Sequence, residues 1–257
     1  ISSPQTVAEG SPADNIITLS APSAVPVTVT VTPAGNGANP TVPADLGAQE
    51  YSTDGGTTFI PVPSGVITIP PGVTSVIVRT PTVNDTTGEP AETFGVTLSA
   101  PSSGATIATP SVTNTIQASD PVTVSITNGT TVPEGTNSVF TVSLSNPSSV
   151  DTSVTFNTSN GSAVAPGDYT AQTAVTVTIP AGSITATVNV VTIDDAIAGE
   201  GNETINGTIS AVTGGNGATI ATPTAIGTIS DNEGVPTLSI SSPQTVAEGS
   251  PADNIIT

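Results

Sequence analysis

The sequence predicts an all-β protein built from tandem β-sandwiches, and three observations lead to this fold class. Val, Ile and Thr, whose branched side chains favour strands, dominate a chain with only two Tyr and four Phe. Apolar residues alternate with Thr, Ser or Asn in successive runs, as in strands that bury one face. Pro, Gly, Asn and Asp separate these runs at short intervals. The alternation favours a folded chain over the disorder that its acidic, Gly/Pro/Ser/Thr-rich composition could otherwise indicate.

An exact repeat indicates an array of domains. The residues ISSPQTVAEGSPADNIIT occupy positions 1–18 and again positions 240–257, which gives a period of 239 residues. Self-similarity at a fixed period is the sequence signature of a repeat architecture.

Shorter matches divide this period into two related parts. The residues GATIATP occur at 104–110 and at 217–223, and TVAEG at 6–10 resembles TVPEG at 131–135. Each period therefore contains two sandwiches of unequal length.

The first sandwich is expected over residues 1–120, from alternating runs such as VTVTVT at 27–32 and VITI at 66–69. It carries extra residues near 50–62, where Asp54-Gly55-Gly56 has the composition of a hairpin turn.

The second sandwich is expected over residues 121–234, from runs such as VFTVSLS at 139–145 and the alternating stretch 175–193. Residues 235–257 are the start of a further sandwich and can supply about two strands, too few to be stable alone.

Composition excludes several classes of function. Twenty acidic residues against one basic residue give a net charge of −19, which excludes the electrostatic footprint of a nucleic-acid-binding protein and attracts cations instead. With no Cys and no His, the chain has no disulfide, thiolate metal site or imidazole base. No apolar run approaches the roughly 20 residues that cross a bilayer, so we expect no membrane insertion. A Ser nucleophile would lack a His or Lys base, and we therefore expect no enzyme.

Carboxylates of the expected second sandwich lie beside turns, where a sandwich gathers its loops at one end. Several carboxylates within about 5 Å repel one another by roughly 3 kcal/mol per pair at a dielectric near 20. Ca²⁺ accepts about 6–8 oxygen ligands in loose geometry and would remove this repulsion. Spacing alone leaves two alternatives open: a Ca²⁺ site, or acids that only solvate turns.

The segments SVTFNTSNGSAVAPGDYT, VTIPAGSITATVNVVTIDDAIAGEGNETI and GATIATPTAIGTISDNE resemble the Calx-β domain. They carry its Gly-x-Asp-Tyr, Pro-Ala-Gly, Asp-Asp and Glu-x-x-Glu landmarks between an early Glu-Gly and an acidic end, all within 121–234. The resemblance implies a Calx-β-like, immunoglobulin-like sandwich that, in many members, binds Ca²⁺ through loops at one end. Carried over by position, the implied ligands are Glu134, Asp168, Asp194, Asp195, Glu200, Glu203 and Asp231.

The first sandwich resembles the family less closely. Glu50 stands where the Asp of Asp-Tyr is expected, and Asn84 replaces one Asp of the pair. We therefore expect a weaker Ca²⁺ site there, and the same landmark Glu recurs in the repeated phrase. The corresponding candidate ligands are Glu9, Glu50, Asp85, Glu89, Glu92, Asp120 and, in the further sandwich, Glu248.

These features predict a structural stalk or fibre repeat of a large bacterial adhesin or surface protein, located outside the cell. Ca²⁺ at the loops and at the short acidic links 118–122 and 230–236 would stiffen it. Its partners would be neighbouring repeats of the same protein, or further copies of the chain in a fibre. The alternatives are an adhesive module that recognises a host or surface ligand and a Ca²⁺-sensing regulatory domain. Arg79 is expected to pair with a neighbouring carboxylate on the sheet surface.

Overall fold

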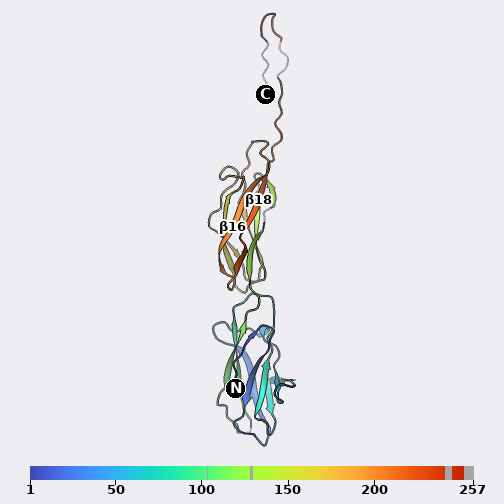
Figure 1. The fold of residues 1–257 in the computed structure, drawn as a ribbon, viewed down its shortest axis with the longest axis vertical. Coiled ribbons are helices and arrows are strands. Elements are labelled where there is room, and N and C mark those ends of the chain that lie inside the picture. Colours follow the sequence, from blue (N-terminus) through green and yellow to red (C-terminus); the bar gives the residue numbers. More distant parts are fainter. Residues whose placement is uncertain (103, 128–129, 241–244, 252–257) are drawn as a thin grey trace.

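A computed structural model describes residues 1–102, 104–127, 130–240 and 245–251. Within these ranges the regular elements are β-strands and two short 3₁₀ turns, so the predicted all-β fold class is confirmed. Two sandwiches lie end to end along the long axis of the molecule (Figure 1). In the described ranges no helix is long and apolar enough to cross a membrane.

The first sandwich packs a five-stranded sheet of order β1-β9-β8-β3-β6 against a four-stranded sheet of order β2-β7-β4-β5. The 3₁₀ turns are η1 (Pro43–Asp45) and η2 (Pro63–Gly65). The strands are β1 (Thr6–Ala8), β2 (Ala13–Thr18), β3 (Val27–Gly35), β4 (Glu50–Ser52), β5 (Ile60–Pro61), β6 (Val66–Ile69), β7 (Ser75–Thr80), β8 (Glu92–Ser99) and β9 (Ser111–Gln117).

The second sandwich packs a five-stranded sheet of order β11-β18-β16-β13-β14 against a four-stranded sheet of order β15-β12-β10-β17. Its strands are β10 (Thr123–Thr127), β11 (Thr131–Pro133), β12 (Asn137–Leu144), β13 (Thr152–Asn160), β14 (Val175–Ile179), β15 (Thr185–Val191), β16 (Glu203–Gly214), β17 (Thr219–Thr222) and β18 (Thr224–Ser230).

Each sandwich has its own apolar core, formed by the alternate residues that face inward. In β12, for example, every second side chain from Ser138 to Leu144 is buried. Phe140 and Phe156 are fully buried from opposite sheets, with ring centroids 5.4 Å apart, and Phe94 is fully buried in the first sandwich. The alternating sequence pattern therefore assigns the strand faces directly.

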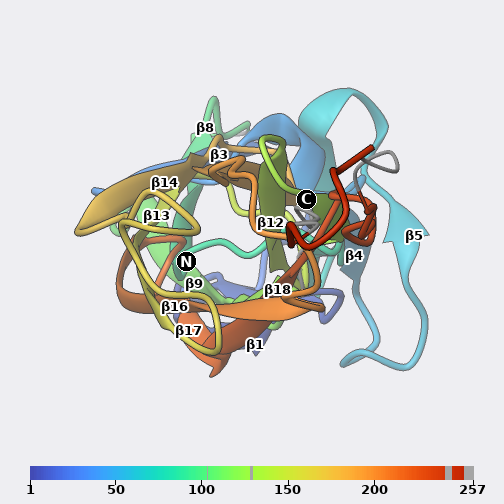
Figure 2. The ribbon, with the colours of Figure 1, turned by 90° about the horizontal axis from the view of Figure 1, so that it is seen from above.

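The expected turn at residues 54–56 closes the β4–β5 hairpin, which projects from the side of the first sandwich (Figure 2). Arg79 on β7 lies next to this hairpin. Its guanidinium donates two hydrogen bonds of 2.8 Å to Asp14 and lies 3.7 Å from the centre of the Phe59 ring. The expected pairing of Arg79 with a neighbouring carboxylate is confirmed.

The two sandwiches meet at a joint formed around Gly88, in the loop between β7 and β8. The Gly88 N–H donates to the Pro147 carbonyl at 2.7 Å, and the Ser149 N–H donates to the Gly88 carbonyl at 3.1 Å. The Asn216 amide also donates to the Gly88 carbonyl, at 2.7 Å. A Cβ on Gly88 would lie 2.1 Å from a methyl group of Val122, so only glycine allows this close approach.

Beyond β18 the chain extends away from the second sandwich (Figure 1). Residues 231–240 and 245–251 contribute no strand of the expected third sandwich. Its remaining residues, 241–244 and 252–257, lie outside the described ranges.

Candidate metal centres

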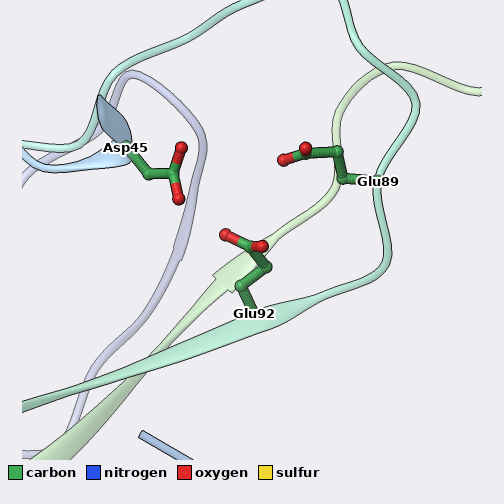
Figure 3. A group of neighbouring side chains, drawn as sticks. All are labelled: Asp45, Glu89 and Glu92. Atoms are coloured by element: carbon green, nitrogen blue, oxygen red, sulfur yellow. The ribbon is translucent and has the colours of Figure 1, made fainter. Parts of the chain in front are cut away.

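Carboxylates converge at the same end of each sandwich. In the first sandwich, Asp45, Glu89 and Glu92 form what we call the first group. One carboxylate oxygen from each lies within 4.8 Å of the others, and the three side chains point toward one another (Figure 3). Asp45 ends η1, Glu89 lies in the loop that carries Gly88, and Glu92 begins β8. The fold thus gathers the first group from segments far apart in the sequence.

Hydrogen bonds of the main chain hold Asp45 in place. The Val42 N–H donates to its carboxylate at 2.6 Å, and the Val83 N–H donates to its carbonyl at 2.8 Å. Asp168 in the second sandwich is held in the same way, by the N–H groups of Val164 (2.6 Å) and Ile193 (2.9 Å). Asp45 is therefore the structural equivalent of Asp168.

The structure does not bring Glu50 to the first group, so the position expected for Glu50 is wrong. Glu50 begins β4 and lies opposite Arg79 on β7. Tyr51 follows Glu50 in the sequence, so this pair resembles the Asp-Tyr landmark. Both residues lie in the β4–β5 hairpin, away from the first group. Asp45, which was not among the expected ligands, takes the expected place.

Electrostatic repulsion is strong in the first group. Burial, then the Asp45 carboxylate and its hydrogen bond to Glu92, raise the pKa of Glu92 to about 7. Burial and the charges of Asp45, Asp85 and Glu9 raise the pKa of Glu89 as well. A bound cation would remove this repulsion.

The expected ligands Glu9 and Asp120 lie beside this group and meet at Ser119. The Ser119 hydroxyl is 2.6 Å from the Glu9 carboxylate, 2.9 Å from the Asp120 carboxylate and 3.4 Å from the Asn84 side-chain oxygen. Asp85 accepts a hydrogen bond of 2.6 Å from the Thr87 N–H, which shapes the loop that leads to Gly88.

In the second sandwich, Glu134 is the centre of what we call the second group. Its carboxylate is within 4.8 Å of those of Asp194 and Glu233, and also within 4.8 Å of those of Asp195 and Glu200. Glu134 is only 8% exposed, and no salt bridge to it is found among the described residues. Burial first, and then the neighbouring charges, raise its pKa.

Two further expected ligands lie beside the second group. Glu203 shares a hydrogen bond with Asp168, and burial together with the Asp168 charge raises the pKa of Glu203 to about 7. This pair corresponds to Glu92 and Asp45 in the first sandwich.

Asp231 is not part of the second group, and its carboxylate instead holds the surrounding loops. It accepts hydrogen bonds from the N–H groups of Gly199 (2.6 Å), Glu200 (3.1 Å) and Glu233 (2.8 Å). Those hydrogen bonds lower the pKa of Asp231 and keep its carboxylate charged.

Glu233 belongs to the second group, although it was not among the expected ligands. Its Oε2 atom is buried and has no hydrogen-bond partner among the described residues. The neighbouring Asn232 amide donates to the Glu134 carbonyl at 3.2 Å and to the Asp194 carboxylate at 3.0 Å. The acidic end SDNE was the available signal for Glu233.

Glu248 lies in the extended segment after the second sandwich, where it is exposed and belongs to none of these groups.

The donors of the first and second groups are all carboxylate oxygens, which hard divalent cations such as Ca²⁺ prefer. An orphaned buried oxygen on Glu233 and a buried, unneutralised Glu134 both fit a cation. The residues present therefore fit Ca²⁺.

The fold and these groups define a tandem of β-sandwiches with acidic loop ends. The model of the Calx-beta domain matches residues 20–122 and 117–233, and the chain belongs to this family. Calx-β domains are calcium-binding modules.

Solved structures similar to this chain include calcium-binding domains of the same family. The Apo-form Calx CBD1 domain is 19% identical, with a TM-score of 0.39, over 44% of this chain and 100% of that chain. CBD12 from CALX1.2 is 13% identical, with a TM-score of 0.37, over 88% of this chain and 96% of that chain. CBD12 of CALX1.1 is 14% identical, with a TM-score of 0.37, over 87% and 96%. No curated protein matches the sequence.

Proposed function

We propose that this chain is a structural repeat in the stalk or fibre of an extracellular surface protein, stiffened by Ca²⁺ at the carboxylate end of each sandwich. Membership of a calcium-binding family supports the choice of ion. The recurrence of residues 1–18 at 240–257 supports an array of such repeats. The end-to-end arrangement of the two sandwiches suits an extended array (Figure 1).

The residues that would hold Ca²⁺ are those of the two groups. In the first sandwich they are Asp45, Glu89 and Glu92, with Glu9, Asp85 and Asp120 close by. In the second sandwich they are Glu134, Asp194, Asp195, Glu200 and Glu233, with Glu203, Asp168 and Asp231 close by. The ion would supply charge neutralisation, and the carboxylates would fix the loops that carry them.

One observation carries the proposed stiffening. Gly88, which makes the joint to the second sandwich, is the residue directly before Glu89 of the first group. Without a cation, repulsion among Asp45, Glu89 and Glu92 disfavours the position in which the Glu89 loop lies close to η1 and β8. A Ca²⁺ ion bound by Glu89 would hold this loop, and therefore Gly88, in the position that docks on Pro147 and Ser149.

The experiment compares the hydrodynamic shape of the chain in EDTA and in Ca²⁺. We expect Ca²⁺ to raise the melting temperature and to narrow the range of shapes seen by small-angle X-ray scattering, with a changed sedimentation coefficient. The double variant E89Q/E92Q should lose the effect on shape. The matched double variant E200Q/E203Q should lose ions from the second group and keep the Ca²⁺-dependent shape. Unchanged sedimentation and melting on addition of Ca²⁺ would contradict the proposal.

A further inference from the structure

A groove of about 620 Å³ opens at the end of the first sandwich that faces away from the first group. One wall is the end of β2 and the following residues up to Ser23, and the other wall is the segment 104–109. Between these walls lies the edge of the apolar core, whose side chains are buried except for the partly exposed Leu19 and Ile107. The floor and sides include Ile17, Leu19, Val29, Ile69, Leu98 and Ile107.

In the second sandwich a strand occupies the corresponding place. There β10 pairs antiparallel with β12 and parallel with β17, so that it fills the space between them. Its Val124 is fully buried, opposite Leu144 on β12 and Ile220 on β17. In the first sandwich, by contrast, β2 is the edge strand of its sheet.

The two sites match residue by residue. The shift of 125 that relates Glu9 to Glu134 also relates Leu19 to Leu144 and Ser2 to Thr127. The bridge between Ser2 and Ile16 accordingly repeats the pairing of Thr127 with Thr141. The first sandwich thus keeps the last pair of this ladder, and the groove lies where the preceding pairs would be.

A seven-residue sequence that occurs in both sandwiches shows the effect of pairing with β10, because its conformation differs between them. The residues GATIATP at 217–223 contain β17, which pairs with β10, but the same residues at 104–110 form no strand. Because the seven residues are identical, the difference comes from their surroundings. The segment at 104–110 has the sequence of a strand and lacks the neighbour that would make it one.

Main-chain groups of the groove are also left without partners. In the second sandwich the Val122 carbonyl accepts from the Thr219 N–H at 3.1 Å, and the Thr123 carbonyl accepts from the Ser145 N–H at 2.9 Å. The corresponding donors in the first sandwich are the N–H groups of Thr106 and Ser20. Neither has a hydrogen-bond partner among the described residues.

The sequence itself contains a segment that fits this place, Val235–Ser239, which we call the donor segment. Ile1, Ile126 and Ile240 each stand eight residues before the landmark Glu, so the donor segment directly precedes a second copy of Ile1. In this register Leu238 corresponds to the buried Val124, and Pro236 corresponds to Val122, whose carbonyl makes the contact described above. Leu238 is 86% exposed where it now lies.

We propose that the groove receives the donor segment of a preceding copy of this sequence, so that the last residues of one repeat complete the first sandwich of the next. Leu238 enters the apolar floor opposite Leu19 and Ile107, and the carbonyls of Pro236 and Thr237 accept hydrogen bonds from Thr106 and Ser20. The lack of an N–H on Pro236 does not matter, because only its carbonyl is used. This inference rests on the proposed array and adds to it a contact at the joint between repeats that is independent of Ca²⁺.

The test places the donor sequence where the proposal requires it. The 257-residue chain is extended before Ile1 by Val-Pro-Thr-Leu-Ser, and a control chain carries the same extension with Asp in place of Leu. Amide hydrogen exchange is measured in EDTA for both chains and for the unextended chain. The second sandwich, whose groove is already filled by β10, is the internal reference.

We expect the Leu extension to slow exchange at Ser20 and Thr106–Thr109 by at least about fivefold, the factor that one net hydrogen bond gives. The Asp extension should leave these rates as in the unextended chain. Equal exchange in the Leu and Asp chains would overturn the inference. Because EDTA is present throughout, that failure would leave the proposed Ca²⁺-dependent stiffening untouched, and a failure of the stiffening would not alter this exchange result.

Discussion

The substitution Gly88→Ala should loosen the joint between the two sandwiches while each sandwich stays folded. The new Cβ would lie 2.1 Å from a Val122 methyl group and 3.1 Å from the Asp120 carbonyl, so the loop must move away. Overpacking of this kind costs about 1–3 kcal/mol. Movement of the loop also loses the hydrogen bonds of Gly88 with Pro147 and Ser149, each worth about 1 kcal/mol net.

Together these effects should destabilise the docked arrangement of the two sandwiches by about 2–4 kcal/mol. This is less than their sum, because a loop that moves away loses the hydrogen bonds but relieves the strain. This lowers the ratio of docked to undocked molecules by a factor of about 30 to several hundred. Each sandwich should stay folded, since Val122 is the one core residue that the new Cβ would meet and the loop that carries residue 88 can move away from it.

The assay uses the absence of cysteine from the chain. Cysteines introduced at the exposed positions Ser99 and Thr173, one in each sandwich, carry spin labels, and their distance distribution is measured by pulsed electron paramagnetic resonance. Gly88→Ala should broaden the distribution. Gly234→Ala, where a Cβ would meet nothing within 4 Å, is the matched control and should not. An unbroadened distribution for Gly88→Ala would refute the reasoning that Gly88 holds the joint.

Three further predictions concern the carboxylates and the core. Asp45→Asn should weaken Ca²⁺ binding to the first sandwich in calorimetric titration, whereas Glu50→Gln should leave it unchanged; unchanged binding by Asp45→Asn would show that Asp45 is no ligand. The pKa values of Glu92 and Glu203 lie near 7 in the fold against 4.5 when unperturbed, so their protonation stabilises the Ca²⁺-free fold. This contribution is fully present below pH 4.5 and is lost as the pH rises through 7. The melting temperature in EDTA should therefore be higher at pH 5.5 than at pH 8, and a rise with pH would contradict the assignment. Phe140→Ala should destabilise the second sandwich by about 3–5 kcal/mol in urea unfolding, since its ring is fully buried against Phe156.

The strands could be predicted from the sequence because alternation of apolar and polar residues is a local property. Runs such as 139–145 and 175–193 became strands whose buried faces follow that alternation. The second group was also largely predictable, since the landmarks of the Calx-β domain are intact there. Only Glu233 was missed, although it ends the acidic run at 231–233.

The first group was harder to predict from the sequence. Because of an inserted hairpin, the residues that resemble the landmark in sequence are not those that take its position in space. Glu50-Tyr51 imitates the landmark, while Asp45-Leu46 occupies its place. A Pro two residues before both Asp45 and Asp168 was the signal that could have identified Asp45. The joint at Gly88 could not be predicted, since it depends on the close approach of two separate sandwiches.

The most direct test of the Ca²⁺-stiffened joint is the distance distribution of the Ser99/Thr173 labelled chain in EDTA and in saturating Ca²⁺, with ion binding verified by native mass spectrometry of the same sample. Ca²⁺ should narrow the distribution markedly, and E89Q/E92Q should abolish the narrowing. A distribution of equal width with Ca²⁺ bound and with Ca²⁺ removed would contradict the account.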